Sequence, residues 1–215
     1  MNNNIINQFA HELRNPLTSA YSTIQLIERS HPEVREYKFW NALAGDFEYM
    51  NDLITKFTHF AQYERLKLEA FSTKAMLEQV SLSFAASIAS SKVEYTSKLD
   101  PSLPIIYGDE VTLKEVIRNL LKNAFEACQP DKTIYLEAFS KNSNLIIQVK
   151  DTGCGIPKEY MPTLFNPFIT HKKDGTGLGL AICNHIVKSH NGTLEVESTP
   201  GIGTTFTVSI PWGNK

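Results

Sequence analysis

The sequence lacks the features that mark membrane, secreted and nucleic-acid-binding proteins. Its 215 residues contain no secretory signal and no apolar run close to the roughly 20 residues that a membrane-spanning helix needs. The formal net charge of −2 gives no basis for binding nucleic acid or an anionic membrane. We therefore expect a cytoplasmic chain with no membrane segment and no nucleic-acid partner.

Cysteine is also scarce, and repeats are absent. The three cysteines, Cys128, Cys154 and Cys183, show neither the spacing of metal ligands nor that of a disulfide framework, so we expect reduced structural thiols. The sequence contains no internal repeat or low-complexity tract. Its length fits one or two compact domains.

One histidine stands out near the N-terminus. Apolar or small residues recur at steps of three or four, which predicts a helix with one buried stripe, at Ile6, Phe9, Leu13, Pro16, Ala20, Ile24 and Ile27. His11 is two residues from both Phe9 and Leu13, about 200° around the helix. We therefore expect His11 to point away from the stripe and into solvent.

The neighbours of His11 suit phosphoryl transfer. A neutral imidazole can attack phosphorus with one nitrogen while a nearby carboxylate takes or orients the proton on the other, and Glu12 is placed for that role. Asn15 lies one turn further on, where its amide can hold water or a phosphoryl oxygen. Pro16 removes a backbone hydrogen bond and predicts a bend just after His11. A surface histidine on an amphipathic helix explains a His-Glu pair alone, whereas the full run with its proline favours a phosphoacceptor.

Residues 1–67 are predicted to form a helical hairpin. The first helix runs from Asn4 to Arg29, and Pro32 starts a second helix after a short turn. The second helix carries a heptad-spaced apolar seam at Trp40, Leu43, Phe47, Met50, Ile54, Phe57 and Ala61. A second copy of the chain covers this seam in a four-helix bundle, or the hairpin packs on its own second domain. We favour the homodimer.

Residues 68–215 are predicted to form a second domain, after a short strand or extended linker near 65–72. Its expected helices are 73–90, 109–128 and 177–190, and its expected strands are 92–97, 133–139 and 144–150. A proline-containing segment between Gly155 and Gly175 reads as a lid.

Several residues of this domain suit a magnesium-nucleotide. Asp151 follows a strand, where a buried carboxylate can accept the exocyclic amine of adenine. Asn119 and Asn123 lie four residues apart on one helix face, and Asn123 is the expected Mg²⁺ ligand. The remaining candidates are glycines for close backbone approach, residues of the glycine-rich phosphate loop, and a phosphate-binding lysine: Gly153, Gly155, Gly175, Gly177, Leu178, Gly179 and Lys172.

In combination, these motifs resemble a known family. His11–Thr18 resembles the phosphoacceptor box of sensor histidine kinases, and the later motifs resemble, in order, the boxes of the ATP-binding superfamily that those kinases share with gyrase, Hsp90 and MutL. The resemblance implies an α+β chain, in which a helical hairpin precedes an α/β sandwich with a mixed, mostly antiparallel sheet. It also implies that Thr205 supports the adenine pocket, that ATP and Mg²⁺ are the cofactors, and that a response regulator receiver domain is the partner.

The resemblance implies a histidine protein kinase that phosphorylates His11 and passes the phosphoryl group to an aspartate. A kinase-silent scaffold and a regulator dominated by phosphatase activity stay open. The chain begins ten residues before His11, so we expect either a fragment or input from another protein. Two positions depart from the wider superfamily. Asn119 replaces the glutamate that activates water in Hsp90 and gyrase relatives, and Glu126 replaces a basic residue, whose phosphate contact Lys122 or Lys172 could supply.

Overall fold

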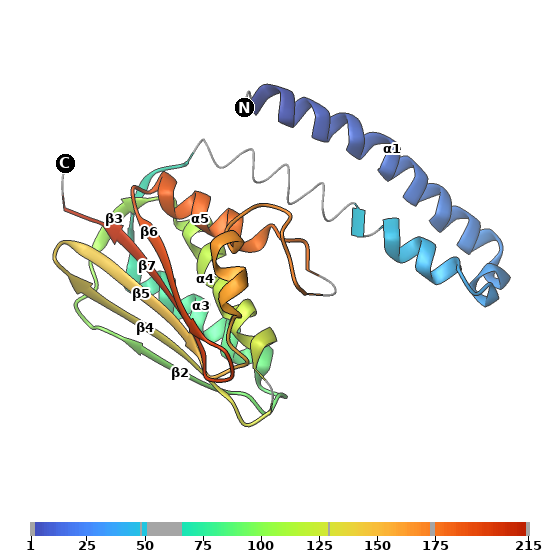
Figure 1. Cartoon of the computed structure of the whole chain (residues 1–215). Helices are drawn as coiled ribbons and strands as arrows, with labels where there is room; N and C mark the ends of the chain where they lie inside the picture. The colour runs from blue at the N-terminus through green and yellow to red at the C-terminus, as the bar shows by residue number, and fades with distance from the viewer. Residues whose placement is uncertain (1–2, 48, 51–65, 129, 173–174, 214–215) are drawn as a thin grey trace. The chain divides into compact units, whose positions relative to one another are not determined.

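The computed structural model describes residues 3–47, 49–50, 66–128, 130–172 and 175–213, with side chains in the first helix from Glu12 onward (Figure 1). The chain divides into two compact units, Met1–Glu64 and Arg65–Lys215, and each is described by itself.

The first unit begins with one long helix. Helix α1 spans Asn3–Ser30 and continues through Pro16. A 3₁₀ helix, η1, follows over Pro32–Glu36, and regular helix resumes at Trp40. The second helix therefore starts later than the sequence pattern predicts, because Pro32 initiates only a short 3₁₀ segment. The rest of the predicted seam, at residues 51–65, lies outside the described residues.

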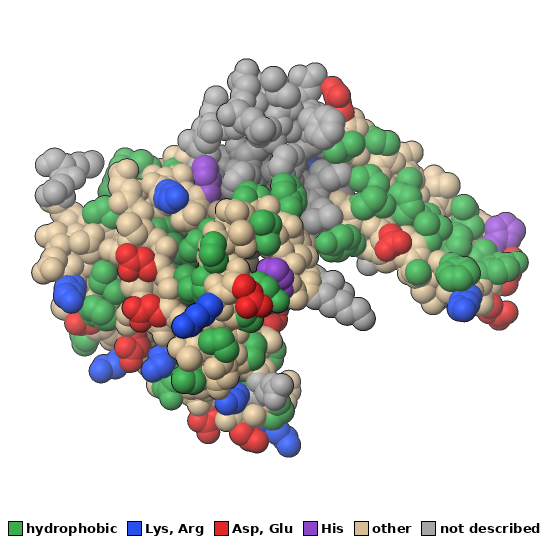
Figure 2. Space-filling model, in the orientation of Figure 1, with side chains coloured by type: hydrophobic (Ala, Val, Ile, Leu, Met, Phe, Trp, Pro, Cys, Tyr) green, Lys and Arg blue, Asp and Glu red, His purple; other side chains and the backbone are tan. Residues whose placement is uncertain are grey.

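Many apolar side chains of the first unit face solvent in this single chain. Figure 2 shows them covering much of the visible surface of this unit. The exposed large residues are Leu13, Leu26, Ile27, Tyr37, Phe39, Leu43 and Tyr49, whereas Ile24 is buried. Such a surface is typical of a helical element that packs against further apolar surface.

The second unit is built on a five-stranded mixed sheet in the order β2-β4-β5-β7-β6. Its strands are β2 Glu94–Leu99, β4 Thr133–Lys141, β5 Asn144–Asp151, β6 Thr193–Thr199 and β7 Gly203–Pro211. Only the β2–β4 pair is parallel, and the other pairs are antiparallel. The predicted mixed, mostly antiparallel sheet is confirmed.

Burial alternates along the central strands, so one face of the sheet carries the core and the other faces solvent. In β5, Leu145, Ile147, Val149 and Asp151 are buried, and the residues between them are more exposed. The core side is covered by three helices (Figure 1), namely α3 Thr73–Ile88, α4 Glu110–Ala127 and α5 Gly179–Ser189. The predicted α/β sandwich is thereby confirmed.

A separate two-stranded sheet begins the second unit. Strand β1, Glu69–Ser72, pairs antiparallel with β3, Ile105–Gly108. The sequence predicts β1 as a strand or linker but does not predict β3, because its four residues are too few to show an alternating pattern.

Among the residues that the structure describes, no helix combines the length and apolar character needed to cross a bilayer.

Candidate functional site

Asp151 is a buried acid at the end of β5. The residue is 4% exposed, and its Oδ1 accepts a hydrogen bond from the Gly153 N–H at 2.8 Å. Burial raises the pKa of this carboxyl, and the N–H groups of Gly153 and Thr204 offset part of the shift. A buried, oriented carboxyl of this kind suits recognition of an amine such as that of adenine.

Two glycines allow the loop after Asp151 to pass close to neighbouring backbone. A Cβ on Gly153 would lie 2.5 Å from the carbonyl oxygen of Ala127 and 2.8 Å from Oδ1 of Asp151. Gly155 has a φ of 69°, and a Cβ there would collide with the Thr199 carbonyl. Only residues without a Cβ allow this close passage of the backbone.

A serine and a threonine that face each other at the paired ends of β6 and β7 secure the same loop. Ser198 Oγ accepts a hydrogen bond from the Ile156 N–H at 2.8 Å and donates to the Gly203 carbonyl at 3.0 Å. Because the single Ser198 proton is used there, the Thr204 hydroxyl donates to Ser198 Oγ across 2.9 Å. The sequence reasoning missed both residues, although Thr204 belongs to the same glycine-rich motif as Thr205.

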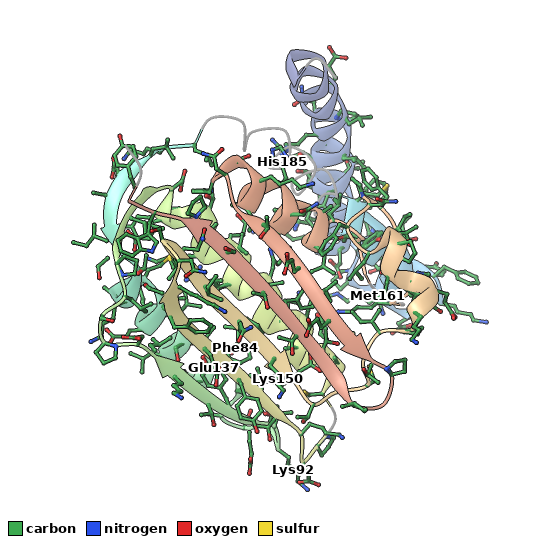
Figure 3. The ribbon with its side chains drawn as sticks, turned by 60° about the vertical axis from the view of Figure 1, so that its left-hand side comes forward. Phe84, Lys92, Glu137, Lys150, Met161 and His185 are labelled. Carbon is green, nitrogen blue, oxygen red and sulfur yellow. The ribbon has the colours of Figure 1, made fainter. Side chains whose placement is uncertain are left out.

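The assignment of Thr205 to the adenine pocket stays a prediction, and the strand register favours its neighbour Thr204 instead. Thr204 pairs with Asp151 and both are buried, whereas Thr205 pairs with Lys150 on the open face of the sheet. There Thr205 helps to line a shallow hollow of about 340 Å³ with Tyr135, Glu137, Gln148 and Lys150. Figure 3 labels Glu137 and Lys150 on this face. Thr204 and Thr205 are one residue apart, and one residue reverses the face of the sheet on which a side chain lies.

The glycine-rich loop leads into helix α5. Gly177 has a φ of 67°, and a Cβ there would lie 2.6 Å from the Phe168 carbonyl carbon. Leu178 is fully buried and precedes the helix, which starts at Gly179 without a side-chain cap. A Cβ on Gly179 would lie 4.0 Å from Oδ1 of Asn119. The α5 N-terminus and the α4 amide therefore face the same space.

A lid lysine contacts the predicted metal ligand. Lys172 Nζ donates to Asn123 Oδ1 at 2.9 Å and also pairs with Glu126 Oε2. Glu126 Oε1 lies 3.8 Å from Lys122 Nζ on the same helix. Asn123 thus already binds a cationic group through its amide oxygen.

One aromatic contact joins two parts of the segment before Lys172. The Tyr160 ring, in the 3₁₀ helix η2 (Lys158–Thr163), stacks on His171 with ring centroids 3.4 Å apart and planes 9° apart. Gly175 accepts no Cβ without a collision with Thr170 Oγ1.

These residues fit a magnesium-nucleotide. Asn123 offers an amide oxygen of the hard type that Mg²⁺ prefers, and it already holds an ammonium in a cation's place. At Gly153 and Gly177 the chain passes so close to neighbouring backbone that a Cβ would collide with it.

The predicted phosphoacceptor residues lie on α1. His11 is in the helical backbone, but its side chain lies outside the described part of the chain. Glu12 and Asn15 are exposed. Their roles, and the exposure of the imidazole, stay predictions.

Two family models match the chain. Residues 1–66 match the model described as His Kinase A (phospho-acceptor) domain. Residues 108–214 match the model described as Histidine kinase-, DNA gyrase B-, and HSP90-like ATPase.

Curated relatives match across the chain. The signal transduction histidine-protein kinase AtoS of Escherichia coli is 30% identical over 203 residues, which cover 94% of this chain and 33% of AtoS. The sensor histidine kinase TmoS of Ectopseudomonas mendocina is 35% identical over 215 residues, covering 94% of this chain and 22% of TmoS. The chain therefore spans well under half the length of these two relatives.

Solved structures share the fold. Full-length ShkA in complex with AMPPNP aligns with a TM-score of 0.82 at 24% identity, covering all of this chain and 47% of ShkA. The catalytic domain of the histidine kinase ThkA aligns with a TM-score of 0.62 at 28% identity, over 68% of this chain and 96% of that domain.

Proposed function

Because the chain belongs to the sensor histidine kinase family, we propose that it binds Mg·ATP, transfers the γ-phosphoryl group to His11, and passes it to an aspartate of a response regulator. The observation that supports this most directly is the buried Asp151 carboxyl beside Gly153, in a unit that follows a His-Glu helix. Homodimer formation is part of the proposal, and the cytoplasmic location stays a prediction.

The second unit would bind and orient the nucleotide. Asp151 accepts the adenine amine, and guanine presents an oxygen there and is rejected. Asn119, Asn123 and the backbone of Gly177 and Gly179 face the phosphates. Mg²⁺, when bound through Asn123, neutralises charge on the phosphate oxygens.

The first unit would supply the nucleophile. One His11 nitrogen attacks the γ-phosphorus, a nitrogen–phosphorus bond forms, and the bond to the β–γ bridging oxygen breaks so that ADP leaves. Glu12 takes the proton from the other ring nitrogen. Most of the rate enhancement would come from positioning the imidazole against the γ-phosphate and from neutralising charge on the phosphate oxygens.

The second transfer needs no further ATP, since the phosphoramidate keeps a high transfer potential. A receiver aspartate oxygen attacks the phosphorus and the nitrogen–phosphorus bond breaks. In a phosphatase reaction, Asn15 would position a water molecule that attacks the phosphoryl group on the regulator's aspartate. The aspartate would then leave as a free carboxylate together with inorganic phosphate.

The test is incubation of the protein with γ-labelled ATP and Mg²⁺. We expect label that is lost in acid and absent from His11→Gln, because a phosphoramidate is acid-labile and needs the imidazole. The label should then move to a purified receiver domain. Label retained in His11→Gln contradicts the proposal, and nucleotide binding without any labelling favours the kinase-silent scaffold.

A further inference from the structure

The contact between Lys172 and Asn123 places a cationic side chain on the oxygen that the proposed function needs for metal. The distance between Lys172 Nζ and Asn123 Oδ1 is 2.9 Å, which is a hydrogen bond of ordinary length. An ammonium and a divalent cation both seek the same amide oxygen, and the two cannot occupy it at once. Whatever holds Lys172 there therefore competes with the metal.

Glu126 is what holds it. Its Oε2 pairs with Lys172 Nζ while Asn123 lies three residues before it on α4, so both acceptors project from the same side of the helix. Lys172 is half-exposed and Glu126 is 37% exposed, so this charge pair is of moderate strength. An amide oxygen alone would hold a lysine more weakly than this combination of an amide oxygen and a carboxylate.

The other neighbours of Glu126 do not explain its position as well. Lys122 lies 3.8 Å from Oε1 and is 70% exposed, so this pair contributes little. Glu126 therefore acts mainly through the lysine that reaches it from a segment 46 residues away in the sequence.

We propose that Lys172 is a tethered competitor of Mg²⁺ for Asn123, and that Glu126 is the positioning residue that keeps it there until the nucleotide arrives. Mg²⁺ bound with the nucleotide displaces the ammonium, and the phosphates offer Lys172 a new anionic partner. The chain thus needs more Mg²⁺ for nucleotide binding than it would without this pair. The inference rests on the proposed function, since it assumes that Asn123 is the metal ligand.

The experiment measures ADP affinity of the full chain by titration calorimetry, first in EDTA and then across a Mg²⁺ series. The readout is the Mg²⁺ concentration that gives half of the increase in ADP affinity between EDTA and saturating Mg²⁺. The ADP affinity in EDTA shows separately whether a variant has lost a direct contact with the phosphates. The variants are Glu126→Gln, Lys172→Met and the double substitution. Glu110→Gln is the matched control, because it removes an i,i+4 carboxylate–lysine pair with Lys114 at the other end of the same helix.

We expect Glu126→Gln and Lys172→Met each to lower the half-saturating Mg²⁺ concentration by about two- to fivefold, the range for an exposed pair. Glu126→Gln should have no further effect in the Lys172→Met background, and Glu110→Gln should have none at all. Circular dichroism will verify that these exposed substitutions leave the fold intact.

Two results would overturn the inference. If Glu126→Gln raises the Mg²⁺ requirement in both backgrounds, Glu126 serves the metal directly. If the two single effects add fully in the double variant, the residues act independently. Failure of the proposed function looks different, because the unaltered chain would then bind no ADP with or without Mg²⁺.

Discussion

At the residue scale, Asp151 shows a conflict between stability and binding. Burial raises its pKa above the ordinary value of 3.8, so the fold disfavours the ionised form. The stability it contributes is greatest below its unfolded pKa and is lost as pH rises through the folded pKa. The form of the carboxyl best suited to accept an amine hydrogen bond is therefore the form that burial disfavours.

We predict that Asp151→Asn lowers ADP affinity by at least about tenfold, the effect of a lost hydrogen bond to a charged group. The same variant without nucleotide should melt at or above the temperature of the unaltered protein at pH 7, because an amide has no ionised form for burial to disfavour. Calorimetric titration and thermal melts measure the two quantities. Unchanged affinity would remove Asp151 from the site.

Thr204 and Thr205 form a natural pair of test and control. Thr204→Val removes the hydroxyl that bonds Ser198, and we expect ADP affinity to fall about two- to tenfold. Thr205→Val alters only the open face of the sheet and should leave affinity unchanged. The reverse order in the same titration would restore Thr205 to the pocket.

At the element scale, Asp109 joins three segments of the second unit. Its Oδ1 caps α4 by accepting the Thr112 N–H at 3.1 Å, and its Oδ2 accepts the Lys67 N–H at 2.9 Å. Its own N–H donates to His190 Nε2 at 2.9 Å, just past the end of α5. Burial lowers the pKa of His190, in keeping with a neutral ring that accepts this bond.

We predict that Asp109→Ala destabilises the second unit by about 1–3 kcal/mol, because one carboxylate satisfies both a helix cap and the Lys67 amide. Asp109→Asn keeps a capping oxygen and should cost less. Ser72→Ala, which removes the exposed cap of α3, serves as the comparison for a cap alone. Urea unfolding followed by circular dichroism ranks the three, and an Asp109→Ala value no larger than that of Ser72→Ala would contradict the prediction.

The sequence is sufficient for some elements of the fold and insufficient for others, among them the nine-residue strand β7, for which no range is predicted. It predicts helix α4 and strand β5 within a residue or two, since each carries a full apolar period. It misses strand β3 because the four residues Ile105–Gly108 form a strand only by pairing with β1.

The candidate site, like the fold, is predictable only where the information is local in the sequence. Motif spacing, which is local, is enough to propose Asp151 and Asn123 as site residues. Ser198 and the pairing of Lys172 with Glu126 depend on contacts between segments 42 and 46 residues apart, so no local pattern reveals them.

At the scale of the whole molecule, the described part of the first unit exposes several large apolar side chains in the single chain. Leu43 belongs to the predicted seam, yet it is 43% exposed in the single chain. A second copy of the hairpin would bury such positions in a four-helix bundle.

We predict that Leu43→Asp shifts the protein from dimer to monomer in sedimentation velocity, because a carboxylate in the bundle seam would be buried without a partner. Asn41→Asp, an exposed position on the same helix and outside the seam, should remain dimeric. A monomeric unaltered protein would refute the bundle.

The alternation along β5 and β7 also bears on how this sequence can drift over time. Gln148 and Lys150 point to the open face, whereas Val149 and Asp151 beside them are buried. Substitutions should therefore be tolerated at an open-face position and constrained at the buried position next to it. Along these two strands, neutral substitutions should accumulate at every second position. Distant descendants of this sequence would keep the buried residues and differ at the residues of the open face.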